Sequence, residues 1–314
     1  MEFGKLPNIE GVNFSLPADD PANQLLWQRL SSDEQPRGVA DEQPRGVAGR
    51  LHVGCTQWGR ADWVGKLYPK GTKQKDFLAY YVKQFNCIEL NTLFYSLQPE
   101  SVIGRWASLA GEDFRFCPKM SESVSHKPQL KNVQQETQLF IDTVSAFGKR
   151  LGTSFLQLAE SFGPDRREVL IDYLRQLPSD FQLCLELRHA GWFGKAADQE
   201  LYSLLFEKSI GTVITDTAGR RDVLHMRLTA PVVFIRFITN SLHPSNLTRI
   251  EDWAHRLKEW MDKGMRGIYF IVHNHDEFYA PDVALHAVER FNAVCGTALK
   301  PPGLIVEPPP LTLF

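Results

Sequence analysis

Several features that would assign this sequence to a function class at once are missing from it. No apolar stretch reaches the roughly 18 residues that a membrane-spanning helix needs, and the first residues lack the basic-then-apolar layout of a signal peptide. The five cysteines form no CxxC pair, which argues against a zinc site or a disulfide framework. Charge is also nearly balanced, with 35 Lys and Arg against 37 Asp and Glu, so there is no overall attraction to nucleic acid or membranes. We therefore expect a cytoplasmic protein with reduced, mostly buried thiols and no membrane partner.

A GxGxxG turn is absent too, which counts against an open dinucleotide-binding sheet. From Leu51 onward the chain instead alternates short apolar runs with amphipathic stretches. Short apolar runs of this kind, each followed by an amphipathic stretch, are typical of a parallel sheet covered by helices. Eight units over about 250 residues predict an α/β fold, a (β/α)₈ barrel of the triosephosphate-isomerase type. The predicted strands are Leu51–Cys55, Cys87–Leu90, Phe114–Cys117, Phe155–Leu158, Leu183–Leu187, Thr212–Thr215, Val232–Phe237 and Gly267–Val272.

The two ends of the chain lie outside this pattern. Residues 1–50 predict an N-terminal extension with a short helix from Pro21 to Leu30, followed by a flexible linker. The linker holds the octapeptide DEQPRGVA twice in succession, at 33–40 and 41–48, which is too short a repeat for a solenoid. Residues 51–300 form the predicted barrel domain, and residues 301–314 form a proline-rich C-terminal tail.

Polar residues stand at the end of almost every predicted strand, where barrels of this type carry their functional groups. Burial of so many charges is costly unless they are paired or take part in function. Two interpretations stay open, a structural ion-pair network and an enzyme active site. The candidate catalytic residues are Glu89, Lys119, Glu186 and Asp216. The candidate ligand-binding residues at strand ends are Asn91, Arg188, Arg236 and Asn274.

The eighth strand offers alternatives because His273 and Asn274 are neighbours. Successive side chains of a strand point to opposite faces, so only one of the two can face the pocket. A metal site built from Glu89, Glu186, Asp216 and one histidine is a weak alternative, and we assign no metal ligands. The sequence leaves any cofactor unassigned.

The loop after the first strand is both basic and aromatic. Arg60 and four lysines (Lys66, Lys70, Lys73 and Lys75) alternate there with Trp58, Trp63 and Tyr68. This combination is suited to an anionic ligand with a flat ring, or to a base of single-stranded nucleic acid. The alternative is that the lysines are solvated and the aromatic residues pack the loop onto the barrel. Trp58 and Arg60 join the candidate ligand-binding residues.

The stretch from Val53 to Tyr95 resembles the YecE-like family, also called domain-of-unknown-function family seventy-two. It reads VGCTQWGRADWVGKLYPKGTKQKDFLAYYVKQFNCIELNTLFY, and further matches are DFRFCPKM from Asp113, ELR from Glu186 and TDT from Thr215. The resemblance spans residues 51 to 295 and implies a barrel of the same type, widespread in bacteria, without an established reaction. The family's shared polar positions fall on Trp58, Trp63, Tyr68, Glu89, Asn91, Tyr95, Trp106, Lys119, Glu186, Arg188, Trp192, Asp216, Arg236 and Asn274. Tyr95 enters the ligand-binding set on this ground.

This chain departs from many of these relatives in two places. Phe237-Ile238-Thr239-Asn240 follows Arg236 where they have a His-Gly pair, and His273-Asn274 stands where they have paired asparagines. Both departures lie at the expected rim of the pocket. They predict a ligand different from that of the commoner subgroup.

These features favour an enzyme that acts on a small anionic or phosphorylated substrate by acid/base chemistry. Glu89 or Glu186 would be the general base, and the cations Lys119, Arg188 and Arg236 would hold the anion. Lys119 is also a candidate nucleophile for imine formation. Two alternatives remain, a nucleic-acid binding or processing module that uses the first loop, and a metal-dependent hydrolase or isomerase.

Overall fold

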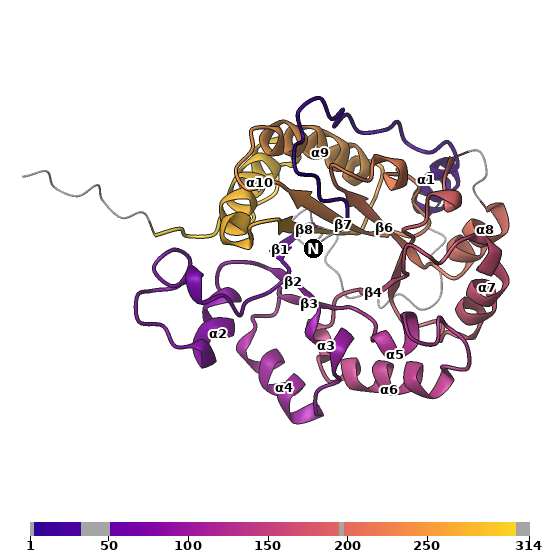
Figure 1. Ribbon diagram of the computed structural model, residues 1–314, viewed down its shortest axis with the longest axis horizontal. Coiled ribbons are helices and arrows are strands. Elements are labelled where there is room, and N and C mark those ends of the chain that lie inside the picture. Colours follow the sequence, from indigo (N-terminus) through magenta and orange to yellow (C-terminus); the bar gives the residue numbers. More distant parts are fainter. Residues whose placement is uncertain (1–2, 33–50, 195–197, 306–314) are drawn as a thin grey trace, which may run out of the picture.

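A computed structural model of the chain describes residues 3–32, 51–194 and 198–305 (Figure 1). Eight parallel strands form one sheet in the order β3-β2-β1-β8-β7-β6-β5-β4, with the helices arranged around it. Strands β3 and β4 are joined only by two isolated bridges, Phe116 to Leu151 and Lys119 to Phe155. These bridges bring the two ends of the sheet together. The fold is a (β/α)₈ barrel of the triosephosphate-isomerase type, as the sequence predicts.

All eight predicted strands are confirmed to within two residues at either end. Each is a short run that is buried on both faces, so propensity and burial favour the same conformation. The strands are β1 (Leu51–Cys55), β2 (Cys87–Leu90), β3 (Arg115–Pro118), β4 (Ser154–Gln157), β5 (Leu183–Glu186), β6 (Gly211–Asp216), β7 (Val232–Thr239) and β8 (Gly267–Asn274). The described helices are α1 (Asn23–Ser31), α2 (Phe77–Tyr81), α3 (Thr92–Tyr95), α4 (Glu100–Leu109), α5 (Glu122–Ser125), α6 (Gln134–Ser145), α7 (Arg167–Gln176), α8 (Gln199–Glu207), α9 (Ser245–Asp262) and α10 (Ala280–Cys295).

Hydrophobic side chains fill the barrel on both sides of its wall. The outer core lies between strands and helices and includes the fully buried stripe of α9, from Ile250 through Trp253 to Trp260. The inner core is smaller and mixes thiols with aromatic rings. It consists of Cys87, Cys117, Phe155, Cys184, Val213, Phe234, Tyr269 and Ile271. These side chains form a packed floor beneath the carboxyl end of the strands.

The cysteines are free, as predicted, and those on the strands are buried. Burial raises the pKa of Cys87 and Cys117 well above the ordinary thiol value, with a further contribution from neighbouring groups. A thiol with so high a pKa is protonated at neutral pH and is a poor nucleophile. Gly54 allows the backbone of Cys87 to pack closely against β1, because a Cβ at residue 54 would lie 2.0 Å from the Cys87 carbonyl oxygen.

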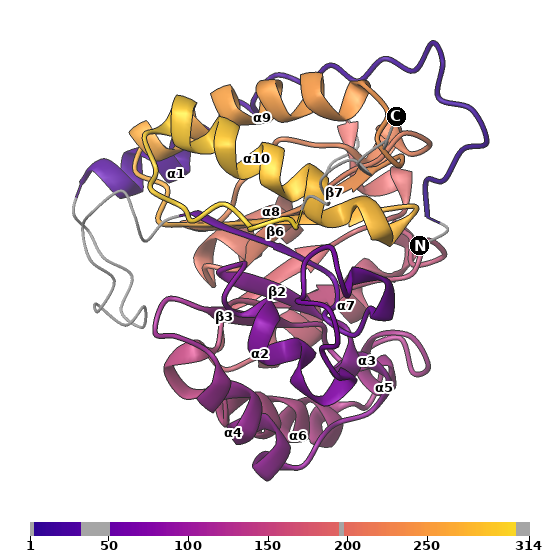
Figure 2. The same cartoon turned by 90° about the vertical axis from the view of Figure 1, so that its left-hand side faces the viewer.

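The N-terminal extension runs over the outside of the barrel (Figures 1 and 2). From the carboxyl end of the strands it passes along α9 and reaches α1 at the far side. Asp19 fixes this path by accepting hydrogen bonds from Arg256 (2.9 Å) and the Trp260 indole (3.1 Å). Helix α1 begins at Asn23, later than predicted, because the Asp20 carboxylate accepts from the Ala22 amide in a turn that precedes it.

Two predicted segments, the DEQPRGVA duplication at 33–48 and the proline run at 308–310, lie outside the described residues. Within the described part of the chain, no helix is both long enough and apolar enough to cross a membrane.

Candidate active site

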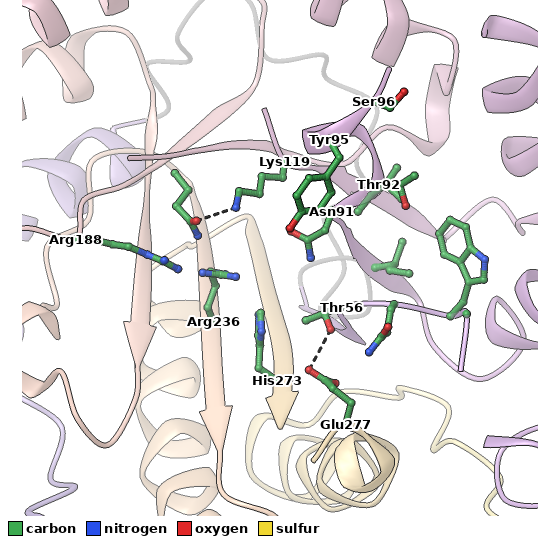
Figure 3. Close-up of a pocket in the computed structure, with 16 residues that line it drawn as sticks. Thr56, Asn91, Thr92, Tyr95, Ser96, Lys119, Arg188, Arg236, His273 and Glu277 are labelled. Atoms are coloured by element: carbon green, nitrogen blue, oxygen red, sulfur yellow. Dashed lines mark hydrogen bonds between the residues drawn. The ribbon is translucent and has the colours of Figure 1, made fainter. Parts of the chain in front are cut away.

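A cavity of about 730 Å³ opens at the carboxyl end of the strands (Figure 3). Its polar lining comes from alternate residues of the strands, those that point into the barrel, and from the loops that follow them. The polar side chains around it are Thr56, Gln57, Asn91, Thr92, Tyr95, Ser96, Lys119, Gln157, Arg188, Arg236, His273 and Glu277. Most of the predicted site residues are therefore brought together in one place.

Arg236, on β7, lies at the centre of this lining. Its side chain is only 1% exposed, and it bridges the two carboxylates of Glu89 and Glu186. Nε and Nη2 each donate to Glu89 over 3.0 Å, and Nη1 donates to both Glu186 oxygens over 3.1 and 3.0 Å. Burial opposes the charge of Arg236, but the two carboxylates outweigh it and raise the pKa further. Arg236 is a permanent cation with a structural partner on either side.

Glu186 is saturated by hydrogen bonds from its neighbours. Besides Arg236, it accepts from Gln157 (2.7 Å), Thr215 (2.9 Å) and Arg188 (2.7 Å). Burial alone would raise its pKa, but the charges of Arg188 and Arg236 lower the pKa to about 2. A carboxylate with so low a pKa and so many donors is a weak base at neutral pH.

Glu89, on β2, also accepts several hydrogen bonds from buried neighbours. It accepts from the Asn91 amide (2.9 Å) and from Nε2 of His273 (2.9 Å), in addition to Arg236. Burial is again outweighed by the Arg236 charge, so the pKa of Glu89 lies well below its usual range. Because an ionised carboxylate only accepts, Nε2 of His273 carries the proton. The ion-pair interpretation therefore fits Glu89 and Glu186 better than the predicted role of general base.

Lys119 differs from these residues because its charge lacks a direct carboxylate partner among the described residues. Its Nζ donates to Oε1 of Gln157 over 2.8 Å and lies 3.9 Å from the centre of the Phe94 ring. Burial lowers the pKa of Lys119 to about 8, and the charge of Arg236 adds to the effect. About a tenth of Lys119 is therefore a neutral amine at pH 7, and about half of it at pH 8.

Glu277 is the functional candidate that the sequence does not reveal. It lies beyond β8, in a short 3₁₀ turn (Glu277–Tyr279), and its Oε1 accepts from the Thr56 hydroxyl over 3.4 Å. Its Oε2 is buried and has no hydrogen-bond partner in the described structure. Burial raises the pKa of Glu277 to about 7. Figure 3 shows Lys119 and Glu277 entering the cavity from opposite sides, with Arg236 and His273 between them.

Asp216 and Asn274 are corrections to the prediction, because both side chains point out of the barrel. Asp216 accepts from Arg249 (3.0 Å) and the Trp253 indole (2.9 Å), and so fixes α9 to the barrel. Asn274 donates to the Thr239 hydroxyl (2.9 Å) and holds the loop after β7. Their neighbours in sequence face inward instead, as strand alternation requires. His273 thus takes the place in the pocket that was expected for Asn274.

The profile of the family described as "Protein of unknown function DUF72" matches residues 52–303. The chain belongs to this family. Its curated relatives include the UPF0759 protein YecE of Escherichia coli (strain K12), which is 29% identical over 252 residues, 74% of this chain and 89% of that protein. The UPF0759 protein YunF of Bacillus subtilis (strain 168) is 24% identical over 162 residues, 49% of this chain and 56% of that protein.

Solved structures of DUF72 family proteins have the same fold. The protein TM1631 from Thermotoga maritima MSB8 aligns with a TM-score of 0.58 and 22% identity, over 78% of this chain and 98% of that one. The protein EF0366 from Enterococcus faecalis V583 aligns with a TM-score of 0.58 and 17% identity, over 79% and 98%. The family profile begins at residue 52, so the N-terminal extension lies outside the region that DUF72 describes.

The aromatic and basic first loop of this DUF72 chain is largely packed against the barrel. Trp63 is fully buried and donates to the Glu277 carbonyl (3.1 Å), and the Tyr68 hydroxyl donates to the Trp58 carbonyl (2.8 Å). Lys66 donates to the Phe278 carbonyl over 2.8 Å. These contacts favour the packing interpretation for all three side chains.

The remaining predicted ligand residues divide between the pocket and the surface. Trp58 and Tyr95 line the pocket, Trp58 with its ring edge-on to Trp106 and Tyr95 with 73% of its surface exposed. Arg60 lies outside the pocket lining and pairs with Asp62 on the surface. Its guanidinium therefore forms an ion pair within the first loop and does not face the cavity.

The carboxylates of the alternative metal site, Glu89, Glu186 and Asp216, do not face one common space in the structure. Asp216 faces α9, and the guanidinium of Arg236 occupies the space between Glu89 and Glu186. The described residues contain no group of three or more His, Cys, Asp or Glu side chains with the spacing of a metal site.

Proposed function

We propose that this DUF72 protein is an enzyme that acts on a small anionic or phosphorylated substrate by acid/base chemistry at the carboxyl end of its barrel. The observation that carries the proposal is the pairing of Lys119 with Glu277. Both side chains face one cavity from opposite sides, and neither has a direct partner of opposite charge among the described residues. Ionisable side chains whose pKa is shifted by burial cluster at active sites, because a general acid or base needs a pKa near the working pH.

The pKa values support a division of labour between the two. Lys119 has a pKa of about 8 and is available as a neutral amine, whereas Glu277 has a pKa of about 7 and still carries a proton in much of the population at neutral pH. Lys119 is thus suited to accept a proton or to attack a carbonyl carbon, and Glu277 is suited to donate a proton. Glu89 and Glu186 hold the cations in place.

The charges of the pocket support an anionic substrate. At pH 7 most of Lys119 is protonated, so Lys119, Arg188 and Arg236 supply three cations. Glu89 and Glu186 supply two carboxylates that are already bound to arginine, and Glu277 is only partly ionised. The surplus positive charge lies in a partly enclosed cavity, where it attracts an anion more strongly than it would in bulk water. Arg188, whose side chain is 12% exposed, is the expected contact of a phosphate or carboxylate group.

A reductive trapping experiment tests this proposal. With glyceraldehyde 3-phosphate and cyanoborohydride, the Lys119 amine adds to the aldehyde carbon, water leaves, and hydride reduces the imine to a stable secondary amine. We expect Lys119 to be labelled faster than the other lysines, with a rate that rises through about pH 8. Peptide mass spectrometry measures the labelling at each lysine.

Two controls make the experiment specific. Glyceraldehyde without the phosphate tests the contribution of the anion, and its labelling of Lys119 should be weaker at equal concentration. Lys73, in the first loop and outside the pocket lining, serves as the reference lysine within the same sample. Labelling of Lys119 at the rate of Lys73, with no preference for the phosphorylated aldehyde, would refute the proposal.

A further inference from the structure

The first described residues of the chain lie at the mouth of the barrel. Gly4 contacts Thr217 and Gly219, which directly follow the carboxyl end of β6. From there the extension passes Phe14 and continues along α9. A segment outside the family's shared region thus reaches the carboxyl end of the barrel, where it contacts the pocket residue Arg188.

The backbone contact that holds this segment is a specific one. The carbonyl oxygen of Gly4 accepts from the Gly219 amide (2.9 Å) and from the Thr217 hydroxyl (3.2 Å), just beyond the end of β6. Gly4 has a φ of +71°, and a Cβ there would lie 2.4 Å from Cγ2 of Thr217. Only glycine satisfies both constraints without rearrangement. The segment is therefore docked in one register rather than lying loosely on the surface.

This register places the Phe3 ring against Arg188. The Cζ of Arg188 lies 4.2 Å from the ring centre, and that of Arg220 lies 4.9 Å from it. Phe3 is only 7% exposed although it lies near the start of the chain. Arg188 lines the cavity and donates through Nε to Glu186, so the ring covers one side of a pocket cation.

We propose that the start of the N-terminal extension supports the ligand site, with Phe3 as the positioning residue for Arg188. The aromatic face and the Glu186 carboxylate together restrict the Arg188 guanidinium to one orientation, and the ring shields it from water. A guanidinium that is already oriented binds an anion at a lower entropic cost. This inference rests on the proposed function only in assigning the anion to Arg188.

The test replaces Phe3 by leucine, which retains an apolar side chain of similar size but lacks the aromatic face. Phenylglyoxal, which reacts with accessible guanidinium groups, should label Arg188 about fivefold faster in F3L than in the wild type. F3Y retains a ring and should restore the wild-type rate. Exchange of the Gly219 amide, measured by NMR, verifies that the segment stays docked.

Phe14 provides a matched control in the same segment. Its ring contacts the Arg249 guanidinium, with Cζ 4.8 Å from the ring centre, and it lies away from the pocket lining. F14A should leave the labelling of Arg188 unchanged. Equal labelling of Arg188 in the wild type and F3L with Gly219 protected, or faster labelling in F14A than in F3L, would overturn the positioning role.

The second measurement uses the trapping reaction described above. In F3L the half-saturating concentration of glyceraldehyde 3-phosphate should rise about fivefold, whereas the maximal trapping rate stays within about twofold. Tighter binding by F3L would overturn the proposal, because it would make the segment an obstruction of the pocket. If the wild type traps no aldehyde, the proposed function fails, and the phenylglyoxal rates still decide the role of Phe3.

Discussion

Two buried ion-pair clusters lie on opposite sides of the same barrel wall. Inside, Arg236 bridges Glu89 and Glu186; outside, Arg249 and the Trp253 indole hold Asp216. Both clusters are desolvated and both consist of arginine and carboxylate. The outer one is covered by α9, while the inner one forms the base of a cavity that also contains Lys119 and Glu277. A buried ion pair therefore does not distinguish the two places. What distinguishes the inner one is the cavity, with two ionisable side chains that lack an oppositely charged partner among the described residues.

The largest effect should come from removing the centre of the inner cluster. Arg236→Met leaves two buried carboxylates without their shared cation, and breaking a buried pair costs about 3–5 kcal/mol. We expect the free energy of unfolding, measured by urea denaturation, to fall by that amount. The pKa of Glu186 should also rise from about 2 towards or above its ordinary value, which carboxylate NMR shifts would report.

Arg249→Met is the matched variant of the outer cluster. It should destabilise the fold by about 2–3 kcal/mol, less than Arg236→Met, because Asp216 keeps its hydrogen bond from Trp253. Labelling of Lys119 by the phosphorylated aldehyde should be unaffected in this variant. A loss of labelling as large as in Arg236→Met would break the distinction between the two clusters.

Glu277→Gln should change how stability depends on pH. In the folded protein Glu277 keeps its proton up to about pH 7, whereas in the unfolded chain it releases the proton near pH 4.3. Its contribution is thus fully present below pH 4.3 and is lost as the pH rises through 7. The glutamine variant does not ionise, so it should be more stable than the wild type by about 1–2 kcal/mol at pH 8. Denaturation curves at pH 4 and pH 8 would contradict this if the difference between the two proteins stayed constant.

The smallest expected effect on stability has the opposite sign from that of Arg236. Lys119→Met removes a partly desolvated charge without breaking an ion pair, so it should stabilise the fold by about 1 kcal/mol at pH 6. The effect should shrink above pH 8, where the wild-type amine is already neutral. Trapping of the aldehyde would disappear from this peptide. A destabilised Lys119→Met would place the lysine among the structural cations.

The sequence predicts the barrel well because each strand is a short apolar run, and the fold buries that run on both faces of the strand. It also predicts the inner cluster, since Glu186 and Arg188 are two residues apart and must share a face. Asp216 was misplaced because the end of a strand does not reveal which alternate residues point inward. Thr215, one position earlier, faces Glu186 inside the barrel.

The role of Glu277 could not be predicted from the sequence for a different reason. Its raised pKa depends on burial beneath the first loop, which is more than 200 residues away in sequence and supplies both Thr56 and Trp63 as contacts. No local pattern encodes such a contact. The extension is a similar case, because only the folded chain brings Phe3 to Arg188.

The boundary between β3 and β4 is the least continuous part of the barrel wall. The other neighbouring strands share ladders of consecutive pairs, with two pairs each between β1 and β2 and between β5 and β6. This join consists of two bridges that are not consecutive, and the backbone of Lys119 forms one of them. Pairs that are not consecutive support one another less than those of a ladder, so we expect local opening of the wall to begin here. Because the backbone of Lys119 forms one of the bridges, such opening would move the amine that faces the cavity.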